Sequence, residues 1–321
     1  MARAPDLDVV VIGSALVEIT PAEMGRPLAE AETMVPLPSG AAANFAGVLA
    51  GLGVRVALLA RVGADELGQW LVRRLGERGI FTDFVAPVPD EMTPVSFAWM
   101  DQDGAKTFFF YRFPGLCDPM GALTREQIDP AQVAAGRLFD FTEATIRNEP
   151  LRSAALHAAE LARAAGREVC YAMNYRPESW RRQTLEQIIA VQRAACAHAD
   201  IVLMNAEEAA LLTGSDDREE AAHTVGALGP RIVLVTSGEQ GAVVLQGDRA
   251  SVVPARRVEV VYDIGAGDAF HAGFVAAHLS GMGALQAARF ASDAAALRIA
   301  RPASAPSPTW GEAAALTQRP V

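Results

Sequence analysis

Lysine and cysteine are scarce in this chain of 321 residues, and their scarcity excludes two kinds of site. Lys106 is the only lysine and does not stand in a Gly-Lys-Ser/Thr context, so a P-loop nucleotide site is excluded. The three cysteines, Cys117, Cys170 and Cys196, lie far apart, with no CxxC pair and no histidine at metal-ligand spacing. The sequence therefore indicates neither a disulfide framework nor a structural zinc site.

Positive charge and long apolar runs are also lacking. The formal net charge is -10, and the 28 basic residues are spread along the chain rather than gathered in one run. This balance opposes binding to a phosphate backbone, so we expect no nucleic-acid partner. The apolar run 9–12 near the N-terminus is too short for a signal peptide or a membrane span. We therefore expect a cytoplasmic protein without a membrane partner.

What the chain does contain is a regular alternation of strand-like and helix-like segments. With 51% hydrophobic residues it can bury a large core. Apolar runs that end at Gly or Asn alternate with amphipathic segments, which predicts an α/β fold with a doubly wound, mostly parallel sheet flanked by helices. The expected strands are 9–13, 55–61, 168–173, 201–204 and 231–236, and the expected helices are 41–53, 67–78, 151–165, 185–197 and 207–212.

Two stretches break this alternation. Residues 15–38 contain four prolines, and residues 93–114 contain two strand-like runs, 95–100 and 107–113, around the sequence Asp-Gln-Asp-Gly. The second stretch has the pattern of a β-hairpin. We expect both stretches to form a small β lid, inserted in a single domain over residues 1–321. Such a lid would cover the carboxyl ends of the parallel strands, where open α/β sheets bind ligands.

The most informative segment is Gly265-Ala266-Gly267-Asp268, which lies between a β-branched run and a helix-like run that continues to Leu279. Small residues at a helix start leave backbone N–H groups accessible, and these groups can hold a phosphate. Asp268 would then stand beside the phosphate as a base. This segment alone is equally compatible with an aspartate that caps a helix after a glycine turn.

Three other segments follow predicted strands or begin a helix, and each has two interpretations. The segment 39–44 contains Asn44, whose amide can recognise hydroxyls, but its small residues also suit tight helix packing. Asn205-Ala206-Glu207-Glu208 is suited to phosphates or a hydrated cation, or to an N-cap with acids in the first turn. The segment 236–241 fits a glycine turn against a nucleotide or an ordinary hairpin.

Two arginines complete the set of candidates. Arg176 follows the strand 168–173, and its planar guanidinium suits phosphate, although a surface arginine is the default interpretation. Tyr111 and Arg112 end the predicted lid hairpin, where the charged tip either clamps a polar substrate or is solvated. Each signal is weak alone. Because all of them are expected at strand ends or on the lid, they can converge on one cleft.

These segments together resemble the ribokinase-like, or PfkB, family of ATP-dependent carbohydrate kinases over nearly the whole chain. The N-terminal family signature is similar to SGAAANFAGVLAGLG at 39–53, and the C-terminal signature to YDIGAGDAFHAGF at 262–274. NAEE at 205–208 and TSGEQG at 236–241 resemble two further family elements in the right order. Within the family, FFFYRFPGLCD at 108–118 and NYRPESW at 174–180 look most like fructokinases and 2-keto-3-deoxygluconate kinases.

The resemblance implies a role for each motif. Asp268 would deprotonate a primary sugar hydroxyl, and the N–H groups of Gly265, Ala266 and Gly267 would form the anion hole for the transferring phosphoryl group. ATP is the implied phosphoryl donor. Its Mg²⁺ would be held largely through waters ordered by Asn205 and Glu208. The remaining implied nucleotide contacts are Arg176, Thr236, Gly238 and Gly241, and the implied sugar contacts are Gly40, Asn44, Arg112, Glu18 and Tyr111.

We expect the substrate to be fructose, giving fructose 6-phosphate. The alternatives are a kinase for 2-keto-3-deoxygluconate or another sugar acid, which would favour an extra cation near Arg112, and a non-catalytic sugar- or nucleotide-binding regulator. The lead-in Tyr262-Asp263-Ile264 departs from the family pattern for a monovalent cation site, so a requirement for K⁺ is left open. Relatives often dimerise through their lids, which makes a homodimer a candidate assembly.

Overall fold

A large, mostly parallel sheet forms the centre of the computed structural model, which describes residues 6–23, 28–100, 106–111, 118–180, 183–261, 265–302 and 305–318. Its nine strands run in the order β13-β12-β11-β10-β9-β8-β1-β4-β5. The pairs from β11 to β5 are parallel, whereas β12 and β13 are antiparallel additions at one edge. The strands are β1 Val9–Ile12, β4 Val56–Gly63, β5 Val85–Val88, β8 Leu138–Thr142, β9 Glu168–Ala172, β10 Ile201–Asn205, β11 Ile232–Thr236, β12 Ala242–Gln246 and β13 Arg249–Val253.

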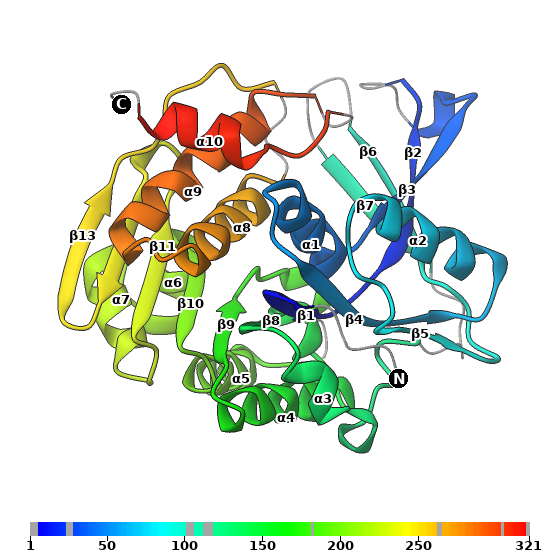
Figure 1. Ribbon diagram of the computed structural model, residues 1–321, viewed down its shortest axis with the longest axis horizontal. Coiled ribbons are helices and arrows are strands. Elements are labelled where there is room, and N and C mark those ends of the chain that lie inside the picture. Colours follow the sequence, from blue (N-terminus) through cyan, green and yellow to red (C-terminus); the bar gives the residue numbers. More distant parts are fainter. Residues whose placement is uncertain are drawn as a thin grey trace.

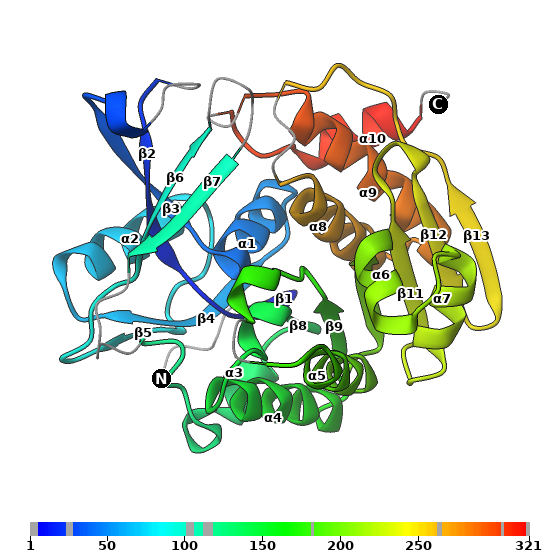
Figure 2. The same cartoon turned by 180° about the vertical axis from the view of Figure 1, so that it is seen from behind.

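Both faces of the sheet are covered by helices, because successive side chains of each strand point to opposite faces. In β1, Val9 and Val11 pack with Phe45 and Phe274 of α1 and α8, whereas Val10 and Ile12 belong to the core on the other face. Figures 1 and 2 show α1, α8 and α9 on one side and α4 and α5 on the other. The helices are α1 Ala41–Gly51, α2 Glu66–Glu77, α3 Pro130–Val133, α4 Leu151–Ala164, α5 Leu185–Ala197, α6 Ala206–Thr213, α7 Arg218–Gly226, α8 Ala266–Leu279, α9 Ala284–Ile299 and α10 Trp310–Thr317.

A second, four-stranded sheet stands apart from the first, near α1 and α2 (Figure 1). Its order is β3-β2-β6-β7, in which β2 Leu16–Pro21 pairs antiparallel with β3 Met34–Ser39 and parallel with β6 Val95–Met100. The strand β7 Lys106–Tyr111 pairs antiparallel with β6, which confirms the predicted hairpin. Both segments predicted to form the lid thus supply strands of this small sheet.

The predicted fold class is confirmed by the layered parallel sheet, and the predicted strands and helices occur within one or two residues of their expected ends. The antiparallel edge of β12 and β13 follows from the segment 236–241, which makes a one-turn 3-10 helix at 238–240 between antiparallel β11 and β12. This is the hairpin interpretation of that segment. In the part of the chain that the structure describes, no helix is long and apolar enough to cross a lipid bilayer.

Candidate active site

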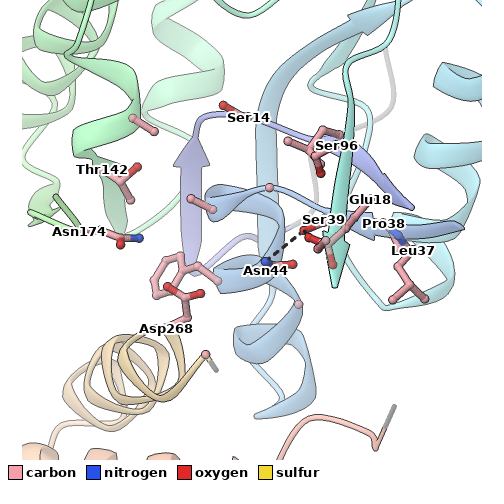
Figure 3. Close-up of a pocket in the computed structure, with 18 of the residues that line it drawn as sticks. Ser14, Glu18, Leu37, Pro38, Ser39, Asn44, Ser96, Thr142, Asn174 and Asp268 are labelled. Carbon is pink, nitrogen blue, oxygen red and sulfur yellow. Dashed lines mark hydrogen bonds between the residues drawn. The ribbon is translucent and has the colours of Figure 1, made fainter. Parts of the chain in front are cut away.

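A cleft of about 3140 Å³ lies between the small sheet and the carboxyl ends of the parallel strands. It is several times larger than the roughly 300–1,000 Å³ of a pocket for one small ligand, so two substrates can be held together. The start of α8 forms one wall and α1 with β2 and β3 forms the opposite wall (Figure 3). The predicted site residues that line the cleft are Glu18, Gly40, Asn44, Arg176, Asn205, Glu208, Thr236, Gly265, Ala266, Gly267 and Asp268.

The first turn of α8 presents backbone N–H groups to this cleft. Gly265 is the N-cap residue in the left-handed conformation, with φ 83°, and makes no side-chain capping bond. The first intrahelical bond runs from Ala269 N–H to the Gly265 carbonyl at 2.9 Å, so the N–H groups of Ala266, Gly267 and Asp268 precede the helical ladder. Small residues make these groups accessible, and the helix dipole adds partial positive charge. The arrangement is suited to an anion.

Asp268 is the third residue of α8, and its carboxylate points into the cleft (Figure 3). The N-cap position of α8 is occupied by Gly265, three residues before Asp268, so Asp268 is not the N-cap residue of this helix. Burial raises the pKa of Asp268, and the positive charges of His271, Arg176 and Arg298 act against that rise. A partly buried carboxylate beside an anion-binding turn is a chemically suitable base.

Opposite Asp268, three polar side chains form a hydrogen-bonded row. Ser39 Oγ donates to Glu18 Oε2 at 3.2 Å, and Asn44 Nδ2 donates to Ser39 Oγ at 3.4 Å (Figure 3). These residues come from β2, the end of β3 and α1, so the row joins the small sheet to the main domain core. An amide, a hydroxyl and a carboxylate supply donors and acceptors for a polyol.

Gly40 joins β3 to α1 and is required sterically. Its φ is 114°, and a Cβ built there would lie 2.3 Å from the Ser14 carbonyl oxygen. Only glycine fits this conformation and this close approach without displacing the backbone. The tight turn brings Ser39 and Asn44 to the same side of α1, so the glycine acts through the geometry of its neighbours.

Asn205 and Glu208 form a reciprocal capping box at the start of α6. The Asn205 side chain accepts from Glu208 N–H, and Glu208 Oε2 accepts from Asn205 N–H, both at 2.8 Å. Glu208 Oε1 also accepts from Tyr175 N–H at 2.6 Å, which ties the segment after β9 to α6. Burial raises the pKa of Glu208, while these backbone donors lower it. The N-cap interpretation of this segment is therefore realised, at a position that also lines the cleft.

The remaining predicted contacts divide into two groups. Arg176 and Thr236 line the cleft, Arg176 as an exposed side chain after β9 and Thr236 at the end of β11. Gly238 and Gly241 are absent from the described lining of the cleft and lie in the turn between β11 and β12. A Cβ on Gly241 would lie 2.0 Å from the Val253 carbonyl oxygen, so this glycine is needed where β13 approaches.

Some predictions fall outside the described residues. Arg112 and the lead-in Tyr262-Asp263-Ile264 belong to segments that the structure does not describe, and of Tyr111 only the backbone is described, as the last residue of β7. The predicted sugar contacts of Arg112 and Tyr111 and the question of a K⁺ site therefore stay predictions.

Arg298 is a cleft residue that lies outside the motifs recognised in the sequence. It lies near the C-terminus of α9, and its Nε would be 3.6 Å from a Cβ built on Gly265. The guanidinium thus adds positive charge directly beside the first turn of α8. No sequence signal marks it, because the rest of α8, a turn and nearly all of α9 separate Arg298 from the GAGD segment.

A helix start suited to an anion, an adjacent carboxylate and, across one cleft, a row of side chains suited to hydroxyls fit a transferase of phosphoryl groups to an alcohol. Residues 6–310 match the model of the pfkB family of carbohydrate kinases. The match spans nearly the whole chain, so the chain belongs to this family and is a carbohydrate kinase, a phosphotransferase.

Comparison with individual proteins agrees with this assignment. The chain is 32% identical to fructokinase-1 of Oryza sativa subsp. japonica over 265 residues, which covers 82% of this chain and 80% of the rice protein. It superposes on a PfkB protein from Polaromonas sp. JS666 with a TM-score of 0.84 and 28% identity, covering 96% and 99% of the two chains. A putative ribokinase II from E. coli, solved with ATP and Mg²⁺, gives 0.85 at 24% identity, covering 97% and 99%, and shows the fold.

Proposed function

We propose that this carbohydrate kinase transfers the γ-phosphate of ATP to a primary hydroxyl of fructose, giving fructose 6-phosphate. The observation that carries the proposal is the placement of Asp268 and the first turn of α8 opposite the row Glu18, Ser39 and Asn44 within one cleft. Similarity to a fructokinase over four fifths of both chains supports the choice of sugar.

In the proposed reaction, Asp268 accepts the proton of the sugar hydroxyl as the hydroxyl oxygen attacks the γ-phosphorus. The new P–O bond forms while the bond between the γ-phosphorus and the bridging oxygen breaks, and ADP leaves with that oxygen. Negative charge on the transferring group faces the N–H groups of Gly265, Ala266 and Gly267. Phosphoryl transfer depends on positioning and electrostatic stabilisation, and these residues supply both.

The residues at the start of α6 fit Mg²⁺ through water rather than by direct coordination. Both carboxylate oxygens of Glu208 already accept backbone N–H groups, and the side chain is 7% exposed. Mg²⁺ readily keeps several of its waters, which such fixed oxygens can orient. When bound, the ion would neutralise charge on the phosphates of ATP. Arg176 and Thr236 are the proposed neighbours of the nucleotide, and the proposed roles of Gly238 and Gly241 are limited to shaping the turn beside it.

The negative charge on the side of the cleft that we assign to the sugar favours a neutral ketose over a sugar acid. Glu18 places a carboxylate next to Ser39 and Asn44, where it accepts hydroxyls but repels a substrate carboxylate. A sugar-acid kinase would need the cation of Arg112 to outweigh Glu18. A regulator without turnover is the remaining alternative, and the retained Asp268 beside an accessible helix start weighs against it.

We further propose that the small sheet acts as a lid on the cleft within one kinase domain, and that it forms the contact of a homodimer. Its edge strand β3 exposes Met34, Val35 and Leu37, each 38–39% accessible, and of these Val35 and Leu37 also line the cleft. Apolar side chains grouped on a strand at a sheet edge favour association. A cytoplasmic location and the absence of nucleic-acid partners stay predictions from the sequence.

The base is tested by the variant Asp268→Asn, which keeps the shape of the side chain but cannot accept the proton. We expect turnover to fall by about 10²–10⁴-fold, in line with the loss of general base catalysis, while binding of ATP persists in a calorimetric titration. Turnover near that of the wild type would refute the base role.

The acceptor is tested by ADP release with fructose, 2-keto-3-deoxygluconate, ribose and adenosine, each with ATP and Mg²⁺. We expect the highest kcat/KM with fructose. Preference for the sugar acid would replace fructose by the alternative acceptor, and the absence of turnover with all four would support the regulator instead.

A further inference from the structure

Three polar side chains meet in the protein core beneath the start of α8. They are Asp140 of β8, Cys170 of β9 and His271 of α8, with exposed fractions of 0%, 0% and 5%. The proposed reaction uses none of them directly. Buried polar groups of this kind are costly unless they are paired, so their conjunction calls for a physical reason.

His271 is the centre of the group. Its Nε2 lies 2.8 Å from Asp140 Oδ2 and 3.4 Å from Cys170 Sγ. Its ring is stacked on Phe45 of α1, with ring centroids 3.9 Å apart and an angle of 18° between the planes. The imidazole is therefore held by β8, β9 and α1 at once, and it fixes α8 against all three elements.

The chemistry of the group is that of one proton shared by an acid–base pair. Burial raises the pKa of Asp140, and the positive charge of His271 opposes this rise. Burial raises the pKa of Cys170 well above its ordinary value, so its thiol stays neutral. The titratable groups that face His271 are Asp140 from β8, Cys170 from β9 and Asp268 from α8 itself, while α1 presents the apolar Phe45.

His271 follows Asp268 by three residues, which places the two side chains one helical turn apart on the same face of α8. In the pair, the imidazole lies on the same helix as the base, and the carboxylate of Asp140 lies on the sheet beyond it. The imidazole is therefore the member of the pair that shares a helix face with Asp268. Consistent with this order, His271 is the larger of the two influences on the pKa of Asp268: it lowers that pKa, and Asp140 raises it.

We propose that Asp140 and His271 form a positioning pair that holds the first turn of α8 on the sheet and turns a positive charge toward Asp268. The proposal rests on the proposed base role of Asp268. His271 lies among the residues that line the cleft, whereas Asp140 does not. We give neither residue a direct part in the reaction: both act through Asp268 and the N–H groups before it. Cys170 is the neutral neighbour of the same ring nitrogen, Nε2, that faces Asp140.

If Asp140 and His271 act as one pair, substitution of either residue should have the same effect on Asp268. Removing His271 leaves a buried carboxyl that becomes neutral, and Asp140→Asn removes the carboxylate partner of the imidazole. Either change abolishes the same dipole. The acidic limb of the kcat/KM profile therefore moves to higher pH in both variants, by about half a unit, less than the roughly 1–3 units of an unopposed charge within ~4–6 Å.

The experiment compares His271→Gln, Asp140→Asn and the double variant with the wild type. We expect kcat to fall about tenfold in each, KM for ATP to change less than twofold, and the double variant to shift the acidic limb no further than either single variant. Asp140→Asn is nearly isosteric and keeps the test available if His271→Gln folds poorly. An unchanged acidic limb in folded variants, or shifts that add in the double variant, would overturn the proposal.

A matched control distinguishes positioning from general loss of stability. Tyr171 follows Cys170 on β9, is fully buried on the opposite face and donates to Gln192. Tyr171→Phe removes a buried polar contact at the same depth, and we expect lower stability with an unchanged acidic limb. A limb that moves equally in this control would contradict the specific role of the pair.

The experiment also separates this proposal from two others. If Asp268→Asn retains turnover, the base role fails. If Asp268→Asn is inactive but His271→Gln leaves the acidic side of the pH profile unchanged, only the positioning pair is refuted.

A metal site is the other alternative. The nearest ligand-type atoms of Asp140, Cys170 and His271 lie within 4.8 Å of one another, which is the one grouping of metal-ligand type found among the described residues. One equivalent of zinc in the purified enzyme, lost in Cys170→Ala, would replace the pair by a metal site.

Discussion

At the scale of single residues, Asp268 is subject to opposing influences. Burial raises its pKa, while His271, Arg176 and Arg298 lower it, and burial is the larger effect. The carboxylate is thus basic enough to accept a proton and stays close to compensating positive charge. This balance explains how an acid beside an anion-binding turn can remain available as a base.

The pH dependence of turnover follows from the direction of that shift. Only deprotonated Asp268 can accept the hydroxyl proton, and a raised pKa means that this form is lost at a higher pH than for an ordinary aspartate. We expect kcat/KM for the sugar to decline on the acidic side with an apparent pKa above 3.8, the ordinary value for aspartate. Initial rates in buffers of constant ionic strength measure this. A limb at or below the ordinary value would contradict the assignment.

The proposed contact between Glu18 and the sugar is tested by substitution of Glu18. In Glu18→Gln the side chain keeps its size but loses its negative charge, and the acceptor from Ser39 becomes a neutral amide oxygen. We expect KM for fructose to rise about tenfold, equivalent to the ~1.4 kcal/mol of one charged hydrogen bond, with KM for ATP little changed. Steady-state kinetics with each substrate varied in turn measure both constants.

The same variant carries its own control for substrate charge. Without the Glu18 carboxylate, activity toward a sugar acid should increase relative to fructose. Glu23 provides a matched substitution, because it follows β2 at the outer rim of the same cleft. If Glu23→Gln raises KM for fructose as much as Glu18→Gln, then general cleft charge, rather than the row of Glu18, Ser39 and Asn44, determines sugar affinity.

At the scale of secondary-structure elements, the site depends on the turns that end strands and begin helices. The turn at Gly40 offers the most direct test of this dependence, because it leaves no space for a side chain. In Gly40→Ala, the new Cβ meets the Ser14 carbonyl at 2.3 Å in a conformation with φ 114°. We expect the free energy of unfolding to fall by about 1–3 kcal/mol and sugar binding to weaken, because α1 must shift. Chemical denaturation and a fructose titration measure the two effects.

Gly47 is the matched control on the same helix. A Cβ at Gly47 would meet nothing within 4 Å, and alanine is favoured over glycine in a helix by roughly 0.5–1 kcal/mol. Gly47→Ala should therefore leave stability unchanged or higher. Equal losses in both variants would show that α1 tolerates no added methyl group, and the argument from the Gly40 turn would fail.

Much of this element scale follows from the sequence because local signals and the final fold agree. The apolar runs that became β1, β10 and β11, and the GAGD segment that begins α8, are recognisable from periodicity and turn residues alone. The sequence does not predict β8, because Asp140 interrupts its apolar run. It does not predict α9 either, because the N-cap residue, Gly283, provides no side-chain capping bond. The antiparallel edge at β12 needed the geometry of the turn.

The contacts between distant segments could not be predicted for a different reason. Asp140, Cys170 and His271 belong to three separate elements, and only the register of β8 with β9, in which Asp140 faces Cys170, brings them under one helix. Arg298 reaches Gly265 through the packing of α9 beside α8. Side chains that meet through tertiary packing leave no periodic signal in the sequence, so the supporting shell of the site emerged only from the structure.

At the scale of the whole molecule, the small sheet provides the contact surface of the homodimer that we propose. The edge strand β3 exposes Met34, next to Val35 and Leu37, which also line the cleft. A lid that pairs with a second lid would be fixed in orientation over its own cleft. Dimerisation and sugar binding would then depend on the same strands, β2 and β3.

If the protein is a homodimer, sedimentation equilibrium should give a mass of about twice the 33.9 kDa of one chain. Met34→Asp places a charge on the proposed contact and should raise the dissociation constant about tenfold or more, since a buried unpaired charge opposes association. Val252→Asp is the control, because Val252 is 60% exposed on β13 at the far edge of the large sheet. A wild-type monomer at every concentration, or equal dissociation in both variants, would place the contact elsewhere or remove it.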